Sequence, residues 1–92
     1  MSDRREPKDG TFPVQEDSIL FALSRGGKLY ASALSWVVRN SAGQEFWTSD
    51  RIVGTMLRRG LVDVGELCEG RVSLKITEKG EVEDLLFQEI FK

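Results

Sequence analysis

Three side chains between positions 51 and 58 have the types and spacing needed to bind an anionic polymer. Arg51, Thr55 and Arg58 are four and three positions apart, and residues at these spacings share one face of a helix. An arginine guanidinium can donate two parallel hydrogen bonds to a guanine edge or a phosphate, and a threonine hydroxyl can contact either group. The three residues therefore indicate a DNA-binding helix face. A basic helix face that is merely solvated is the alternative interpretation.

The positive charge of the chain is concentrated in its middle. The whole sequence has 13 basic and 15 acidic residues, which gives a net charge of −2. Residues 25–59 contain six basic and two acidic residues, a local charge of +4, and the other positions together carry −6. A basic stretch within an otherwise acidic chain favours contact between that stretch and an anionic partner.

A helix over about residues 49–59 is expected to carry the basic face. Thr48 and Ser49 are both good N-cap residues, and Asp50 complements the positive end of the helix dipole. Gly60 accepts the left-handed conformation in which many helices end. We predict that the following residues contact duplex DNA: Thr48, Ser49, Arg51, Thr55, Arg58, Arg59 and Arg71.

Hydrophobic periodicity predicts two helices before the basic one. Apolar residues recur at helical spacing from Val14 to the Gly26–Gly27 pair and again over residues 31–39. Residues 28–30 are expected to form a short extended link between them. The polar residues 40–44 predict a loop, from which Phe46 and Trp47 are expected to fill the core.

A hairpin and a last helix are predicted after the basic helix. Residues 71–77 alternate strictly between polar and apolar, which is typical of a half-buried strand. We expect this strand to pair with residues 61–64, with the hairpin tip near residues 66–70. Thr77 is expected to cap a final helix that continues to Lys92.

Two stretches of the chain resemble winged helix-turn-helix regulators. Residues 48–62 are similar to the recognition helix of that family and its exit of a basic residue, Gly, Leu and Val. Residues 75–80 are similar to the step from wing strand to helix in MarR-type and related prokaryotic regulators. The resemblance implies an α+β winged helix with a three-helix core, a two-stranded antiparallel wing and a C-terminal helix. It also implies a sequence-specific transcriptional regulator with its third helix in the major groove.

The expected wing differs from wings that press onto DNA. Its tip carries Glu66 and Glu69, and Arg71 is its one clear cation. Acidic side chains repel phosphate, so strong DNA contact by the wing is not expected. This keeps a second interpretation open, in which the chain is a protein-interaction module, such as a phage or plasmid accessory protein that binds or inhibits a partner.

The last helix has a wide apolar face, which predicts association. An exposed apolar stripe usually marks an interface, and a two-fold homodimer through this helix is the expected form. The alternative is that the stripe closes the core of the monomer. The predicted dimer interface consists of these residues: Val82, Leu86, Phe87, Ile90 and Phe91.

Several function classes lack the residues that they need. The chain has no histidine and one cysteine, so nucleophile–base pairs and tetrahedral zinc sites are not expected. We expect no enzyme activity, cofactor or bound metal. No apolar run approaches the ~20 residues of a membrane span and no signal sequence is evident, so a cytoplasmic protein is expected. Residues 1–13 are predicted to be a flexible tail and residues 14–92 the winged-helix domain.

Overall fold

The computed structural model describes residues 13–33 and 35–90. The predicted flexible tail falls, apart from Pro13, outside these residues, and so does Phe91. The elements follow in this order: α1 (Glu16–Ser24), β1 (Lys28–Ala31), β2 (Trp36–Arg39), β3 (Glu45–Thr48), α2 (Asp50–Arg58), β4 (Val62–Val64), β5 (Ser73–Ile76) and α3 (Glu78–Ile90).

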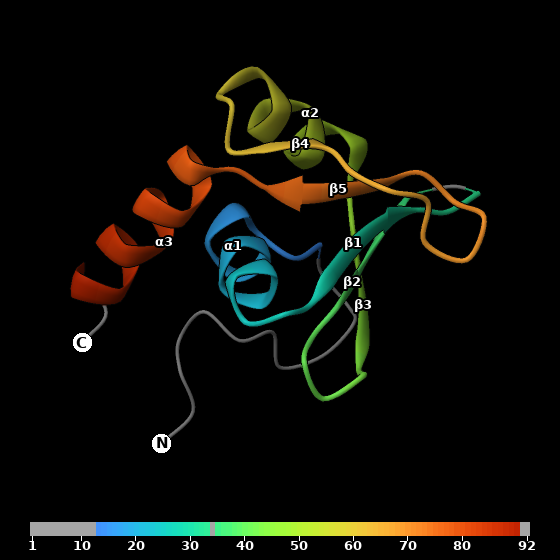
Figure 1. Ribbon diagram of the computed structural model, residues 1–92, viewed down its shortest axis with the longest axis horizontal. Helices are drawn as coiled ribbons and strands as arrows, with labels where there is room; N and C mark the ends of the chain where they lie inside the picture. Colours follow the sequence, from blue (N-terminus) through green and yellow to red (C-terminus); the bar gives the residue numbers. More distant parts are fainter. Residues whose placement is uncertain (1–12, 34, 91–92) are drawn as a thin grey trace.

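The strands form one antiparallel sheet in the order β3-β2-β1-β5-β4. Helix α1 packs against one face of this sheet and lies between the strands and α3 (Figure 1). Helix α2 sits beside α1 and β4, near the top of the same view. The opposite face of the sheet carries no helix in the described part of the chain.

The core lies between α1 and the sheet. Leu29 lies opposite Val38 on β2 and opposite Leu74 on β5. These three side chains project toward the helices together, because residues directly opposite each other on neighbouring strands share a face. Ile19 and Leu20 of α1 meet them and are fully buried. Helix α2 contributes its own buried residues to the same cluster: Val53 and Met56.

The predicted helix over residues 31–39 is wrong, because this stretch ends β1 and forms β2. Val37 and Val38 are β-branched and fit a pleated strand better than a helix. Residues 40–44 turn the chain, with Gly43 at a positive φ of 86°, and β3 then pairs with β2. Phe46 and Trp47 are therefore strand residues that point to opposite faces, and Phe46 packs against the core.

The winged-helix architecture is also wrong. The predicted hairpin is confirmed as β4 and β5, with Val62 opposite Ile76. It is not a separate two-stranded wing, because β5 also pairs with β1 and so joins the hairpin to a five-stranded sheet. The described helices do not form a three-helix core but pack around this sheet.

The end of α2 and the start of α3 are tied together by Thr77. The Thr77 hydroxyl donates a hydrogen bond to the Gly60 carbonyl at 2.6 Å and accepts one from the Gly80 backbone N–H at 3.1 Å. The predicted cap is thus confirmed, and it also links two helices. A Cβ on Gly80 would lie 2.2 Å from the Leu61 carbonyl oxygen, so only glycine permits this close approach.

Candidate functional site

Helix α2 begins where β3 ends and is fixed there by side-chain hydrogen bonds. The Ser49 hydroxyl accepts a bond from the Ile52 N–H at 3.2 Å, which confirms the predicted N-cap. The Trp36 indole N–H on β2 donates to the Asp50 carboxylate at 2.7 Å. The sheet therefore sets the position of the first turn of α2.

The outward face of α2 combines two arginines with two small residues. Arg51 and Arg58 are exposed, seven positions apart, and Gly54 and Thr55 lie between them. The Thr55 hydroxyl donates to the Arg51 carbonyl at 2.9 Å and accepts a bond from the Arg58 guanidinium at 3.1 Å. We call these four residues the α2 face.

Four of the predicted DNA contacts do not belong to the α2 face. Ser49 is one of them, because its hydroxyl caps the helix. Thr48 is fully buried, and its hydroxyl donates to the Val14 carbonyl at 2.7 Å. The Arg59 guanidinium forms ion pairs with Glu16 at 2.7 Å and Glu83 at 3.4 Å, so it links α2 to α1 and α3. Arg71 lies on the β4–β5 hairpin, over the ring of Tyr30.

The charge around the α2 face is uneven. A shallow hollow beside the first turn is lined by Arg51 together with the carboxylate residues Glu16 and Asp17. At the other end, the Lys79 side chain lies within 4 Å of the place a Cβ on Gly60 would occupy. The α2 face is therefore flanked by carboxylates beside its first turn and by Lys79 beyond its last turn.

A polar cluster that the sequence did not predict lies on the sheet face away from α1. The Arg39 guanidinium donates to Glu45 at 2.9 Å, to Tyr30 at 3.2 Å and to Glu69 at 3.4 Å, and the Tyr30 hydroxyl donates to Glu45. We call these four residues the Tyr30 cluster. It unites β1, β2, β3 and the hairpin tip, and becomes visible in the sequence only after the strands are correctly assigned.

Hydrogen bonding within the Tyr30 cluster shifts the pKa values of its members. The bond from Tyr30 and then the bond from Arg39 lower the pKa of Glu45, because both stabilise the carboxylate. The pKa of Tyr30 is raised, first by its bond to Glu45 and second by burial. The pKa of Arg39 is raised by its bond to Glu45 above all. These shifts favour a neutral Tyr30, a charged Arg39 and an ionised Glu45, so the cluster is a structural network.

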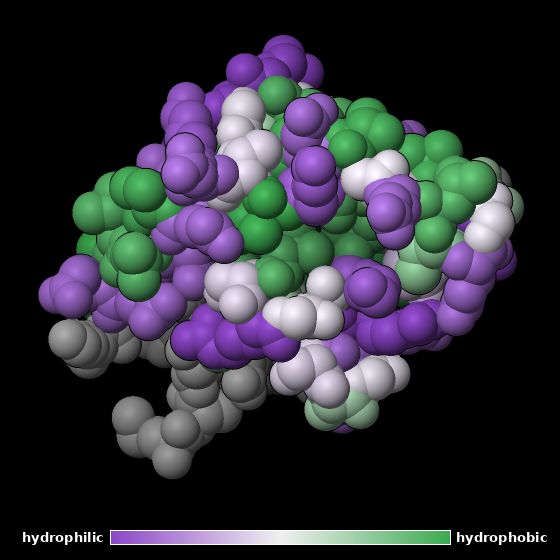
Figure 2. Space-filling view, viewed as in Figure 1, coloured by the Kyte–Doolittle hydropathy of each residue, from purple (hydrophilic) through white to green (hydrophobic). Residues whose placement is uncertain are grey.

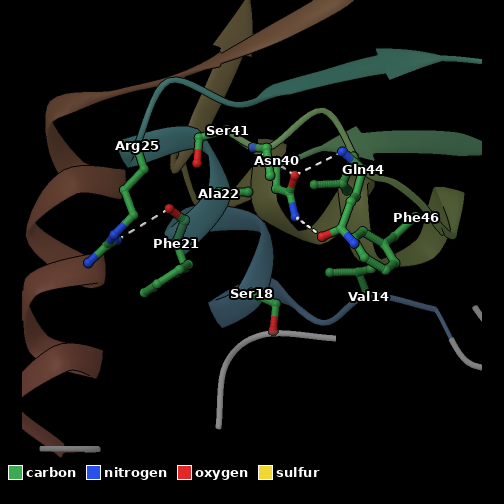
Figure 3. Close-up of a pocket in the computed structure, with 11 residues that line it drawn as sticks. Val14, Ser18, Phe21, Ala22, Arg25, Asn40, Ser41, Gln44 and Phe46 are labelled. Atoms are coloured by element: carbon green, nitrogen blue, oxygen red, sulfur yellow. Dashed lines mark hydrogen bonds between the residues drawn. The ribbon is translucent and has the colours of Figure 1, made fainter. Parts of the chain in front are cut away.

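A small pocket lies between α1 and the β2–β3 turn (Figure 3). Val14, Ala22 and Phe46 give it apolar walls. Asn40 and Gln44 line its rim, but the Asn40 side-chain amide donates to the Gln44 side-chain oxygen at 3.0 Å. The Asn40 side-chain oxygen also accepts bonds from the backbone N–H groups of residues 42 and 44. The side chains of Asn40 and Gln44 therefore stabilise the turn by bonding within it, and we assign no ligand to the pocket.

The predicted dimer residues divide between two sides of α3. Phe87 faces inward and packs against the core. Val82, Leu86 and Ile90 face outward, with exposed fractions of 55%, 53% and 70%. Leu85, which was not among the predicted residues, is exposed beside them.

Among the residues described, no helix combines the length and apolarity needed to cross a bilayer. No family model, curated protein or solved structure matches this chain. None of these comparisons supports the resemblance to MarR-type regulators.

Proposed function

We propose that the chain binds duplex DNA by placing α2 in the major groove, as a small transcriptional regulator does. The observation that carries this proposal is the composition of the α2 face, in which two exposed arginines flank Gly54 and Thr55. Seven helical residues span about 10.5 Å, so Arg51 and Arg58 can reach base edges or phosphates some three base pairs apart. The small residues between them let the helix backbone approach the groove.

The structure supports only a modest number of phosphate contacts. Three of the cations in the basic middle of the sequence, Arg25, Arg39 and Arg59, are held in ion pairs with carboxylates. The cations available near α2 are then Arg51, Arg58 and Lys79. With about two or three phosphates neutralised, log K should fall with log salt at a slope of roughly −2 to −3.

The test is a titration of fluorescently labelled duplexes of varied sequence, followed by anisotropy at 50 mM and 200 mM salt. The double variant Arg51→Ala/Arg58→Ala should bind at least 10-fold more weakly. Lys28→Ala/Lys75→Ala is the matched control, because it removes the same charge from exposed residues on the sheet. It should change affinity less than 3-fold. Lack of binding at low salt, or equal losses for both double variants, would overturn the proposal.

One observation favours a second candidate function, a protein-interaction module. Large aliphatic side chains on α3 face solvent, and exposed apolar patches commonly mark protein interfaces. The two functions use different helices, so one chain can have both.

A further inference from the structure

Most of the aliphatic side chains of helix α3 face solvent, whereas in an ordinary amphipathic helix they would face the core. Its buried residues are Gly80 and Asp84, with Phe87 packed behind them. Its aliphatic residues are more than half exposed and lie at helical spacing on the outer side: Val82, Leu85, Leu86 and Ile90. We call these four residues the α3 stripe. In Figure 2, hydrophobic atoms gather over the part of the molecule where Figure 1 places α3.

The rotation of α3 is set by its attachment to the rest of the fold. Gly80 meets the Leu61 carbonyl so closely that no side chain fits there, and the Thr77 cap fixes the first turn. Residues three, four and seven positions after Gly80 must then face inward, and they are Glu83, Asp84 and Phe87. The α3 stripe therefore points away from the core, and the alternative that it closes the monomer core does not hold for these side chains.

The charges of α3 indicate which kind of partner could pack against the α3 stripe. Five of its residues are acidic and one is a lysine. Glu83 pairs with Arg59, and the buried Asp84 lies 3.9 Å from Arg25, so the remaining carboxylates are the ones that a partner would meet. Glu78 and Glu81 are exposed at its N-terminal end, and Glu89 is exposed near Ile90. A second copy packed two-fold on the stripe would bring two such helices together. Like charges across a helix pair disfavour that arrangement.

We propose that the α3 stripe docks a basic amphipathic helix of another protein. Such a helix offers aliphatic residues at spacings of three and four, which can pack against the stripe. Lysines or arginines along its edges would face the carboxylates of Glu78 and Glu81. Apolar burial supplies affinity in this complex, and the charges select the partner. The proposal does not depend on DNA binding by α2.

The test uses two synthetic helical peptides with the same leucine stripe, one edged by lysines and the other by glutamates. Isothermal titration at 50 mM salt should show binding of the lysine peptide and at least 10-fold weaker binding of the glutamate peptide. Leu85→Ser/Leu86→Ser should weaken binding of the lysine peptide at least 10-fold. Val64→Ser/Leu67→Ser, which removes exposed aliphatic residues from the hairpin, should leave it unchanged.

A charge-reversal variant tests whether the lysine peptide recognises the carboxylates of α3 or binds the acidic protein without specificity. Glu78→Lys/Glu81→Lys should shift the preference toward the glutamate peptide at least 10-fold. Equal affinity for both peptides in the unmodified protein would overturn the proposal. So would a peptide-free dimer in sedimentation that Leu85→Ser/Leu86→Ser abolishes, because a second copy would then occupy the stripe.

Discussion

The phenol of Tyr30 on β1 donates a hydrogen bond to the carboxylate of Glu45 on β3, across the strand that separates them. Arg39 on that middle strand donates to both groups. Side chains thus join the same three strands that the backbone ladders join. Glu69 reaches Arg39 from the hairpin tip, so the cluster also ties this tip to the sheet.

The ionisation of Tyr30 should be measurable without interference. It is the only tyrosine in the chain, so the rise in near-ultraviolet absorbance on tyrosinate formation reports this residue alone, because the two tryptophans absorb but do not titrate. We expect its pKa above 10.0 in the folded protein, chiefly because of the bond to Glu45. Glu45→Gln should lower it toward the ordinary value, whereas Glu69→Gln, which removes a partner of Arg39 only, should change it less. If Glu45→Gln left the pKa of Tyr30 unchanged, the bond to Glu45 could not be the cause of the raised pKa.

Acid should weaken the fold partly through Glu45. Its pKa is lower in the folded protein than the ordinary 4.5, so its contribution to stability is present above that value. The contribution is lost as pH falls through the folded-state pKa. Urea unfolding of the unmodified protein and of Glu45→Gln should therefore differ most near neutral pH and converge at low pH. A difference that stays constant with pH would show that the charge of Glu45 is not the cause.

Two glycines in helices should respond in opposite directions to alanine. Gly80→Ala places a Cβ 2.2 Å from the Leu61 carbonyl oxygen, and we expect a loss of about 1–3 kcal/mol as α3 shifts. Gly54→Ala meets only the end of Arg58 at 3.6 Å, and better helix propensity should add roughly 0.5–1 kcal/mol. Thermal or urea unfolding measures both. Equal effects from the two substitutions would argue against the close contact at Gly80.

Loss of the Thr77 hydroxyl should cost more than loss of a comparable hydroxyl on α2. Thr77→Val removes a helix cap and the bond to Gly60, and we expect a loss of ~1–2 kcal/mol. Thr55→Val is the control, because its hydroxyl bonds only within α2. It should cost less than half as much in the same urea titration. A larger effect at Thr55 would contradict the linking role of Thr77.

Local signals predicted the parts of the fold that local interactions determine. Ser49 and Thr77 were recognisable caps, and the strict alternation of residues 71–77 predicted β5. The error at residues 31–39 arose because apolar residues at mixed spacing can match a helix or a strand. Val37 and Val38 before a turn that contains Gly43 were the available strand signal, and the partner strand β3 decides the outcome through tertiary pairing.

The candidate sites could be predicted only in part, for a related reason. Arg51, Thr55 and Arg58 share a face because of helix geometry alone, so their grouping followed from spacing. The direction in which α3 turns its apolar residues depends on the contact between Gly80 and Leu61, which are far apart in sequence. Likewise, the capture of Arg59 by Glu16 and Glu83 requires three helices to be in place.

The hydrogen bonds of Thr77 to Gly60 and Gly80 have a consequence for assembly. They hold the end of α2 against the beginning of α3, and Arg59 reinforces the joint through Glu83. These contacts, together with the packing of both helices against α1, fix how α2 and α3 lie relative to each other in this structure. If α2 binds DNA and α3 binds a partner helix, as proposed above, the fold would hold the two ligands at a defined separation.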